Sequence, residues 1–420
     1  MPRLRRKMKA QPIYYFDNNA TTRVAPEVVE VMLPFLREQW GNPSSIYGFG
    51  KQLAKPLEAA REKVAALINA EPRELIFTSC GTESNNSAIH SALVTHPQKR
   101  HVVTTAVEHS ANIKFCAHLK KIGFHVTLLP VESDGALDIH LLEKSIRPDT
   151  AIVSVMWANN ETGVLFPIEE IAAICRSKHA LFHTDAVQAP GKLKMDVKEL
   201  GADFLSLSAH KLHAPKGIGL LYVRHGVKYQ PYVIGGGQEQ GRRGGTENVV
   251  GIVGFGRAAE LAMTHLKDEN ARIRALRDKL EDGILKSIAS VARNGSKDER
   301  LPNTSNLSFE GVEAEGILLL LDELGICASS GSACTSGSLD PSHVLMAMGC
   351  SPARARGSVR FSLSIYNTEA EVDFLLKHLP PIISKLRTQA HGKSSHQSSN
   401  RRWTQTNADA KNKAPETSAS

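Results

Sequence analysis

The sequence predicts an α/β fold, with a mostly parallel seven-stranded sheet flanked by helices and a smaller α+β domain after it. First, short apolar runs alternate with helix-length amphipathic segments from about residue 60 to about residue 225. Second, this alternation is typical of a parallel sheet that is covered on both faces. Third, the pattern changes at about residue 257, where a long amphipathic segment begins. At 420 residues the chain is too long for one simple core, so we expect two domains.

Seven apolar runs are the expected strands: 75–78, 101–105, 125–129, 152–156, 181–184, 204–207 and 220–223. Helices are expected between them at 83–94, 110–122 and 167–178. A long helix, broken at most once, is expected over about 257–291, with short apolar runs at 306–309 and 317–324 after it. Ligands of such sheets bind at the carboxyl ends of the strands, so functional residues should directly follow the runs.

The charge distribution indicates where the folded body begins and ends. The formal net charge is +8, but residues 1–11 hold five basic residues and no acid, and residues 392–420 hold five basic and two acidic residues. The body between them is therefore neutral, which gives no reason to expect nucleic-acid binding. We expect these units: a disordered basic N-terminus at 1–11, a segment at 12–20 that packs on the small domain, a large domain at 21–262, a small domain at 263–391 and a disordered tail at 392–420.

Composition favours a soluble globular protein in a reducing compartment. Hydrophobic residues make up 41% and charged residues 22% of the chain, and no apolar run approaches the roughly 20 residues of a membrane span. The six cysteines form no CxxC pair, so independent thiols are expected. The basic N-terminus has no apolar stretch of a secretory signal, and as a mitochondrial presequence it would be very short and without serine. We therefore expect a cytoplasmic protein that contacts no membrane.

Lys211 is the first candidate for catalysis. It follows the run 204–207 within Ser-Ala-His-Lys at 208–211, and turn residues then lead to a second apolar run at hairpin distance. Burial at a strand end favours the neutral amine of a lysine. Such amines form Schiff bases with carbonyl compounds, pyridoxal phosphate (PLP) among them. The alternative is a surface lysine in a hairpin turn.

Polar residues also follow three other runs. Gly81 and Thr82 open a predicted helix, where free backbone NH groups and a hydroxyl can bind an anion, although an ordinary threonine N-cap is an alternative. His109 follows the second run and could stack on a planar ring or move a proton, or be merely structural. Asn160 lies in Asn-Asn-Glu-Thr-Gly after the fourth run, in a loop suited to orienting a polar ligand.

Asp185 ends the fifth run within His-Thr-Asp-Ala-Val-Gln at 183–188. A buried carboxylate between apolar neighbours needs a cationic partner, and a protonated pyridine nitrogen would serve. The rival interpretation is a metal pair of His183 and Asp185, which is weak because no third ligand is placed.

Two later segments add candidates. The glycine-rich stretch 235–245, which ends at Thr246, could approach a phosphate as a backbone nest or, read as Arg-Gly low complexity, could suggest RNA. Residues 328–338 are mostly Ser, Gly and Ala, so we expect a mobile loop whose strong nucleophile is Cys334. Cys327, on the apolar run before it, is expected to be buried and inert. Arg360 follows on a predicted strand and presents a fork suited to a carboxylate, unless it is a plain surface arginine.

Together these motifs resemble the cysteine desulfurases of the NifS/IscS family, in the class-V aminotransferase group of fold-type-I PLP enzymes. The resemblance runs from about residue 15 to about residue 387. It rests on motifs that occur in the family's order: Asn-Asn-Glu-x-Gly, His-x-Asp-x-x-Gln, Ser-x-His-Lys and Ser-Ser-Gly-Ser-Ala-Cys-Thr-Ser. Cys80, where a small residue is expected, and His213, where an aromatic residue or glycine is expected, depart from the family pattern.

The resemblance implies a PLP-binding large domain and a role for each candidate residue. Lys211 would bind PLP covalently, and Asp185 would pair with its ring nitrogen. Gln188 would bond the ring oxygen, while His109 would stack on the ring and shuttle protons. The phosphate would be held by Gly81, Thr82, Ser208 and His210, with Thr246 contributed by the partner of a homodimer. Asn160 would contact cofactor and substrate, and Arg360 would bind the substrate carboxylate.

The implied reaction removes sulfur from L-cysteine, leaving a persulfide on Cys334 and releasing L-alanine. The sulfur would pass to an acceptor or an iron–sulfur scaffold protein; no permanent metal site is expected, although the Cys334 persulfide could ligate a nascent cluster. The tail does not resemble the scaffold-docking end of the housekeeping members, and the motifs lean toward the NifS side. The alternatives are a selenocysteine lyase or another class-V aminotransferase, a non-catalytic sulfur-transfer scaffold, and a nucleic-acid-binding module.

Overall fold

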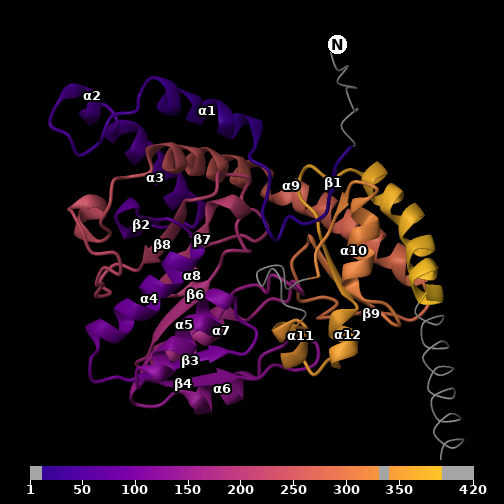
Figure 1. Cartoon of the computed structure of the whole chain (residues 1–420). Helices are drawn as coiled ribbons and strands as arrows, with labels where there is room; N and C mark the ends of the chain where they lie inside the picture. The colour runs from indigo at the N-terminus through magenta and orange to yellow at the C-terminus, as the bar shows by residue number, and fades with distance from the viewer. Residues whose placement is uncertain (1–11, 331–339, 390–420) are drawn as a thin grey trace, which may run out of the picture.

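The computed structural model describes residues 12–330 and 340–389, which form a larger and a smaller lobe (Figure 1). The larger lobe is built on a seven-stranded sheet in the order β2-β8-β7-β6-β5-β3-β4. Its strands are β2 (Leu75–Thr78), β3 (His101–Thr105), β4 (His125–Leu129), β5 (Thr150–Ser154), β6 (Leu181–Asp185), β7 (Phe204–Ser208) and β8 (Gly219–Val223). The predicted seven-stranded, mostly parallel sheet is confirmed, with β8 antiparallel to both of its neighbours.

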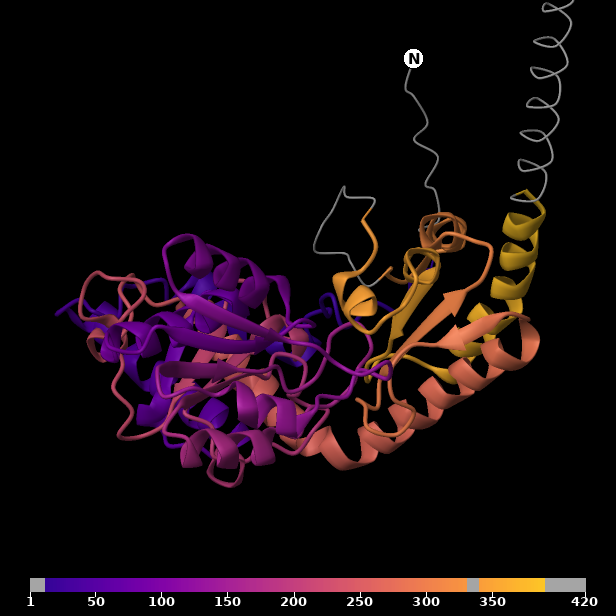
Figure 2. The same cartoon turned by 90° about the horizontal axis from the view of Figure 1, so that it is seen from below.

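Helices cover both faces of this sheet (Figures 1 and 2). The helices of this lobe are α1 (Pro26–Arg37), α2 (Gly48–Lys51), α3 (Ala54–Leu67), α4 (Gly81–Thr95), α5 (Ser110–Lys121), α6 (Ile139–Ser145), α7 (Ile168–Ser177) and α8 (Val197–Leu200). Short 3-10 turns are η1 (Pro72–Glu74), η2 (Ala209–Lys211) and η3 (Gln238–Gly241). One core cluster joins α4 and α5 to the sheet, and another joins α3, α7 and the strands. The strand ends are therefore held rigidly, as a site built on them requires.

Helix α9 (Val249–Ser287) runs from the larger lobe into the smaller one (Figure 2). The sequence predicted a start near residue 257 and a possible break, whereas the helix begins at Val249 and continues for 39 residues. The expected domain boundary at 262/263 falls inside it. Its segment 249–266 is long and apolar enough for a membrane span by length and composition alone. Within the fold, helix α9 packs on α1 and α3.

The smaller lobe combines a three-stranded antiparallel sheet with helices. Its elements are β9 (Val291–Arg293), β10 (Thr304–Phe309), α10 (Ala314–Asp322), α11 (His343–Ala347), α12 (Pro352–Arg356), β12 (Ser358–Ser362) and a last helix over residues 369–389. The N-terminal strand β1 (Tyr14–Tyr15) pairs with β11 (Ile326–Cys327), and Phe16 is fully buried in this lobe's core. Residues 12–20 therefore contact the smaller lobe, although they precede the larger one in sequence.

A buried ionic cluster stabilises the smaller lobe. The Glu281 carboxylate accepts two hydrogen bonds of 2.7 Å from Arg300, one of 2.6 Å from Arg293 and one of 2.7 Å from Ser305. Burial opposes ionisation of Glu281, but the bonds from Arg300 and Ser305 lower its pKa to about 2. This carboxylate therefore stays ionised inside the fold.

Candidate active site

A cavity of about 370 Å³ lies at the carboxyl ends of the sheet strands. The chain segments that follow β2, β3, β5, β6 and β7 all contribute to its wall, together with the N-terminal segment and β12. Ten residues predicted from the sequence line it: Gly81, Thr82, His109, Asn160, Asp185, Gln188, Ser208, His210, Lys211 and Arg360. The structure thus gathers these candidates in one place, from positions up to 279 residues apart in the chain.

Lys211 ends the 3-10 turn η2 that directly follows strand β7. Its Nζ donates to the backbone carbonyl of Ala20 at 2.6 Å and also to that of Asn19. The amine is therefore held at the cavity by the N-terminal segment and does not extend from a hairpin turn into solvent.

Asp185 presents a buried carboxylate at the end of β6. Its Oδ2 accepts a 2.6 Å hydrogen bond from Asn85 on α4, and its Oδ1 accepts from the backbone of Val187 at 3.0 Å. Among the described residues, no cation pairs with Asp185 within ion-pair distance. A buried carboxylate that faces a cavity without a cation is suited to a cationic ligand atom.

The start of α4 forms another wall of the cavity. Its N-cap residue, Cys80, makes no side-chain cap, so the N-cap side chain leaves the backbone NH groups of the first turn uncapped, and Gly81 and Thr82 of that turn line the cavity. A Cβ on Gly81 would lie 2.8 Å from Val187 Cγ2, so glycine is needed for this close approach. Helix α4, which is 15 residues long and begins here, favours an anion at its N-terminus.

Two histidines of the cavity differ in their surroundings. His210 Nδ1 lies 3.1 Å from Thr21 Oγ1, and burial, helped by the charge of Lys211, lowers the pKa of His210 to about 4. His210 is thus a neutral hydrogen-bonding group at pH 7. His109 is the N-cap of α5, where its Nδ1 accepts from the backbone of Ala111 at 3.2 Å. In a neutral His109 ring the proton is therefore on Nε2.

Arg360 is a fully buried arginine on β12. Its Nη2 lies 2.6 Å from Asp17 Oδ1, and its Nη1 donates to the carbonyl of Asn160 at 2.9 Å. The third nitrogen, Nε, has no hydrogen-bond partner within the described chain. The guanidinium is therefore not the surface arginine considered from the sequence, and it keeps a donor for a ligand.

Two predicted residues are not placed in this cavity. Thr246 does not line the cavity of its own chain. Cys334 lies outside the described residues, so the structure says nothing of its position. The described chain ends before it at Ser330, and the backbone of Ser329 pairs with that of Arg360. Cys327 is half-buried, and burial together with Asp322 raises its pKa, as for an unreactive thiol.

The metal pair that competed for Asp185 is not supported. The two ring nitrogens of His183 lie 2.8 Å from Ser154 Oγ and 2.9 Å from Ser206 Oγ, inside the sheet. Burial lowers its pKa to about 3, so the ring is neutral and structural. Within the described chain, no group of three or more His, Cys, Asp or Glu residues is placed to hold a metal ion.

Sequence reasoning missed two residues that shape the site. Asn85 holds Asp185, and a signal existed, because α4 carries several buried polar residues and lacks one clearly polar face. Asn19 connects three parts of the chain: its side chain donates to Thr304 at 2.9 Å and to the carbonyl of Asn160 at 3.1 Å. No local sequence pattern predicts such long-range hydrogen bonds.

Comparisons with known proteins agree on one family. The profile of the class-V aminotransferases matches residues 14–375. The chain is 55% identical to cysteine desulfurase 2 of Trichormus variabilis over 375 residues, which cover 89% of this chain and 94% of that one. It is 53% identical to the cysteine desulfurase NifS of Azotobacter vinelandii over 374 residues, or 89% and 93% of the two chains.

The chain belongs to the NifS-like cysteine desulfurases of the class-V aminotransferase family. Solved structures agree with this assignment. A NifS-like protein superposes with a TM-score of 0.84 at 42% identity, covering 89% of this chain and 99% of that chain. SspA, solved in complex with cysteine, gives a TM-score of 0.75 at 38% identity over 84% and 99% of the two chains. The predicted family and fold are thereby confirmed.

Proposed function

We propose that this cysteine desulfurase takes sulfur from L-cysteine with the help of PLP and leaves it as a persulfide on Cys334. The observation that carries the proposal is that the Lys211 amine, the uncompensated Asp185 carboxylate and the buried Arg360 line one cavity. The relative SspA was solved in complex with cysteine, which supports the same substrate class here.

The residues of the cavity fit PLP at three points. The N-terminus of α4, with Gly81 and Thr82, suits the phosphate. Asp185, which has no cation among the described residues, suits the protonated ring nitrogen. Lys211 supplies the amine for the aldehyde. Asn160, Gln188, Ser208 and His210 would complete the contacts, with His109 stacked on the ring. When bound, PLP supplies a ring that accepts the electron pair released at the substrate α-carbon.

The chain's own residues would then bind the substrate and move its protons. Arg360 orients the substrate by its carboxylate, and Asn160, whose carbonyl already holds Arg360, fixes that arginine. Lys211, once its amine is free, would remove the α-proton as a base. His109, which would carry its proton on Nε2 when neutral, would shuttle protons, including one to the product carbon.

The sulfur transfer itself would belong to Cys334. Its thiolate attacks the substrate sulfur; an S–S bond forms, the substrate C–S bond breaks, and the electron pair of that bond stays with the carbon, which is protonated to give L-alanine. The described chain before Cys334 is anchored beside Arg360 by the Ser329 pairing, which supports delivery of the thiol to this cavity. The persulfide would then pass to an acceptor or an iron–sulfur scaffold protein.

We further propose that the enzyme works as a homodimer in which Thr246 reaches the partner's phosphate site. An apolar groove of about 740 Å³ runs from Thr82 to Tyr232 between α4 and α5, and Thr82 also lines the candidate active site. Ile234, two residues after Tyr232, is 87% exposed, which is unusual for an isoleucine that no partner covers. A second copy on this surface would cover apolar area beside the phosphate site.

Replacement of the thiol tests the proposal most directly. Cys334→Ser should keep the visible absorbance of bound PLP and should still change it on addition of L-cysteine, yet release no sulfide or alanine. Lys211→Ala should lose the absorbance. Cys327→Ser is the matched control and should retain wild-type turnover. Wild-type sulfide release by Cys334→Ser would rule out the assigned nucleophile.

A further inference from the structure

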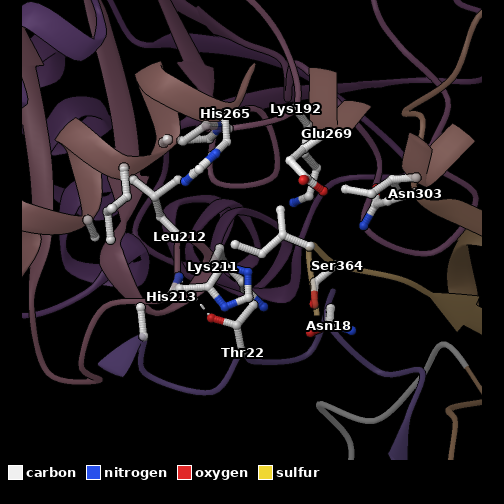
Figure 3. Close-up of a pocket in the computed structure, with 18 of the residues that line it drawn as sticks. Asn18, Thr22, Lys192, Lys211, Leu212, His213, His265, Glu269, Asn303 and Ser364 are labelled. Atoms are coloured by element: carbon white, nitrogen blue, oxygen red, sulfur yellow. Dashed lines mark hydrogen bonds between the residues drawn. The ribbon is translucent and has the colours of Figure 1, made fainter. Parts of the chain in front are cut away.

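Lys192 places its side-chain amine behind the candidate active site. With Lys211 it lines a small, mostly apolar cavity of about 60 Å³ between the two lobes (Figure 3). The residue as a whole is half-buried, but its charged end is deep: burial, followed by the charge of Lys211, lowers the pKa of Lys192 to about 7. Burial disfavours the charged form of this lysine, so its position requires an explanation.

The Lys192 ammonium donates to one residue of the described chain, Gln188. Its Nζ lies 3.1 Å from the backbone carbonyl of Gln188 and 3.4 Å from the side-chain Oε1. In its protonated form the Lys192 side chain has three donors and no acceptor, so it can donate only to the oxygen end of a neighbouring amide. The reverse orientation would place the Gln188 NH₂ group against the ammonium. Lys192 therefore fixes which way the amide of Gln188 points.

The orientation of Gln188 continues to the catalytic amine. Gln188 Nε2 donates to the carbonyl oxygen of Asn19 at 3.0 Å, and the same oxygen accepts from Lys211 Nζ. Gln188 also lines the active-site cavity. One N–H of the amide is therefore used on Asn19, and the second remains as a donor on the side of the cavity. The bonds form a continuous chain from Lys192 through Gln188 and Asn19 to Lys211.

We propose that Lys192 is a positioning residue for the cofactor: by occupying Oε1 of Gln188, it keeps the Nε2 hydrogens directed to Asn19 and to the ring oxygen of PLP. The inference rests on the proposed function, because Gln188 needs a ring oxygen to bind. A donor fixed in advance stabilises the ionised ring oxygen without reorganisation when the cofactor binds. Lys192 itself does not touch substrate or cofactor in this arrangement.

The test measures the bound cofactor and not turnover. In the holoenzyme, the pH midpoint at which the visible PLP band titrates reports the hydrogen bond to the ring oxygen. Lys192→Met keeps most of the length of the side chain and removes the donor; since it removes a buried charge, the fold should be retained. We expect the midpoint to rise by about 0.5 pH unit or more, in the same direction as in Gln188→Leu. The affinity of the apoenzyme for PLP, measured by fluorescence titration, should fall in both variants.

A double-mutant cycle separates positioning from a direct charge effect. If Lys192 acts through Gln188, then Lys192→Met should cause no further change in a Gln188→Leu background. Equal shifts in both backgrounds would mean that Lys192 acts by its own charge and would overturn the inference, as would a Lys192→Met protein identical to wild type. Lys194→Met, two residues along and 76% exposed, is the matched control. A wild-type protein without a visible PLP band would instead refute the proposed function.

Discussion

Arg360 Nη2 and Asp17 Oδ1 lie 2.6 Å apart, so the buried arginine of the smaller lobe is ion-paired to the segment that begins the described chain. The same guanidinium bonds the Asn160 carbonyl of the larger lobe. Arg360 is thus held from both sides, with Nε left as a donor. A planar guanidinium that is fixed in this way is already oriented to bind a carboxylate.

Replacement of Arg360 should weaken substrate binding. Arg360→Lys keeps the charge but cannot reach Asp17, Asn160 and a carboxylate together. We expect KM for L-cysteine to rise about 10- to 100-fold, since a bond to a charged group is worth roughly 1.5–3 kcal/mol. The visible absorbance of bound PLP should not change. Steady-state sulfide release gives KM, and Arg356→Lys, a half-exposed arginine at the end of α12, is the control. An unchanged KM would exclude Arg360 as the carboxylate site.

Removal of the Asp185 charge should slow turnover. Asp185→Asn preserves the size of the side chain but no longer stabilises a protonated ring nitrogen. We expect kcat to fall by about 10²- to 10³-fold, the usual effect of removing one electrostatic contact at the reacting centre. Absorbance should show that PLP still binds, because the contacts at α4 remain. A variant with wild-type kcat would show that Asp185 only supports Asn85 structurally.

The Glu281 cluster should make stability depend on pH in a defined range. The pKa of Glu281 is lowered from 4.5 to about 2 in the fold, so its contribution is complete above about pH 4.5 and is lost as the pH falls toward 2. Glu281→Gln should destabilise the protein by about 3–5 kcal/mol at pH 7, because it leaves the buried Arg300 without its carboxylate partner. The difference in free energy of unfolding between this variant and the wild type should shrink below pH 4.5. Denaturant unfolding at several pH values measures this, with the exposed Glu299→Gln as control.

The proposed dimer can be dissociated at its apolar surface. Ile234→Asp places a charge on a side chain that is 87% exposed in one chain, so the isolated fold should tolerate it. A dimer that buries Ile234 should dissociate, and PLP should be retained less well because the partner's phosphate contact is lost. Sedimentation velocity measures whether the protein is a dimer or a monomer. Leu319→Asp, at an equally apolar but distant exposed position, should leave the dimer intact. A wild-type monomer would end this part of the proposal.

The fold and the cavity could be predicted because both depend on local patterns. Buried parallel strands appear as apolar runs, and the topology of such a sheet brings the residues after each run to one edge. Lys211, Asp185 and His109 were found in this way. The contacts of Asn19 could not be found, since they join residues more than 140 positions apart. His183 misled because its serine partners lie on neighbouring strands, 29 and 23 positions away.

Lys192 shows a further limit of the sequence. It is four residues after Gln188, but these residues are not helical, so helical spacing gives no reason to pair them. Only the turn that follows β6 returns its ammonium to the Gln188 amide. Its burial depends on α9 and the smaller lobe, which arrive from later in the chain.

The unbroken course of α9 constrains how the two lobes can move. A flexible linker would let them swivel freely, but a helix of 39 residues behaves as a stiff strut whose bending costs energy along its whole length. The crossing at residues 12–20 forms a second tether between the same lobes. The distance between amine and guanidinium should consequently stay nearly constant throughout a catalytic cycle, so specificity would be built into the resting architecture and would not depend on closure of the lobes.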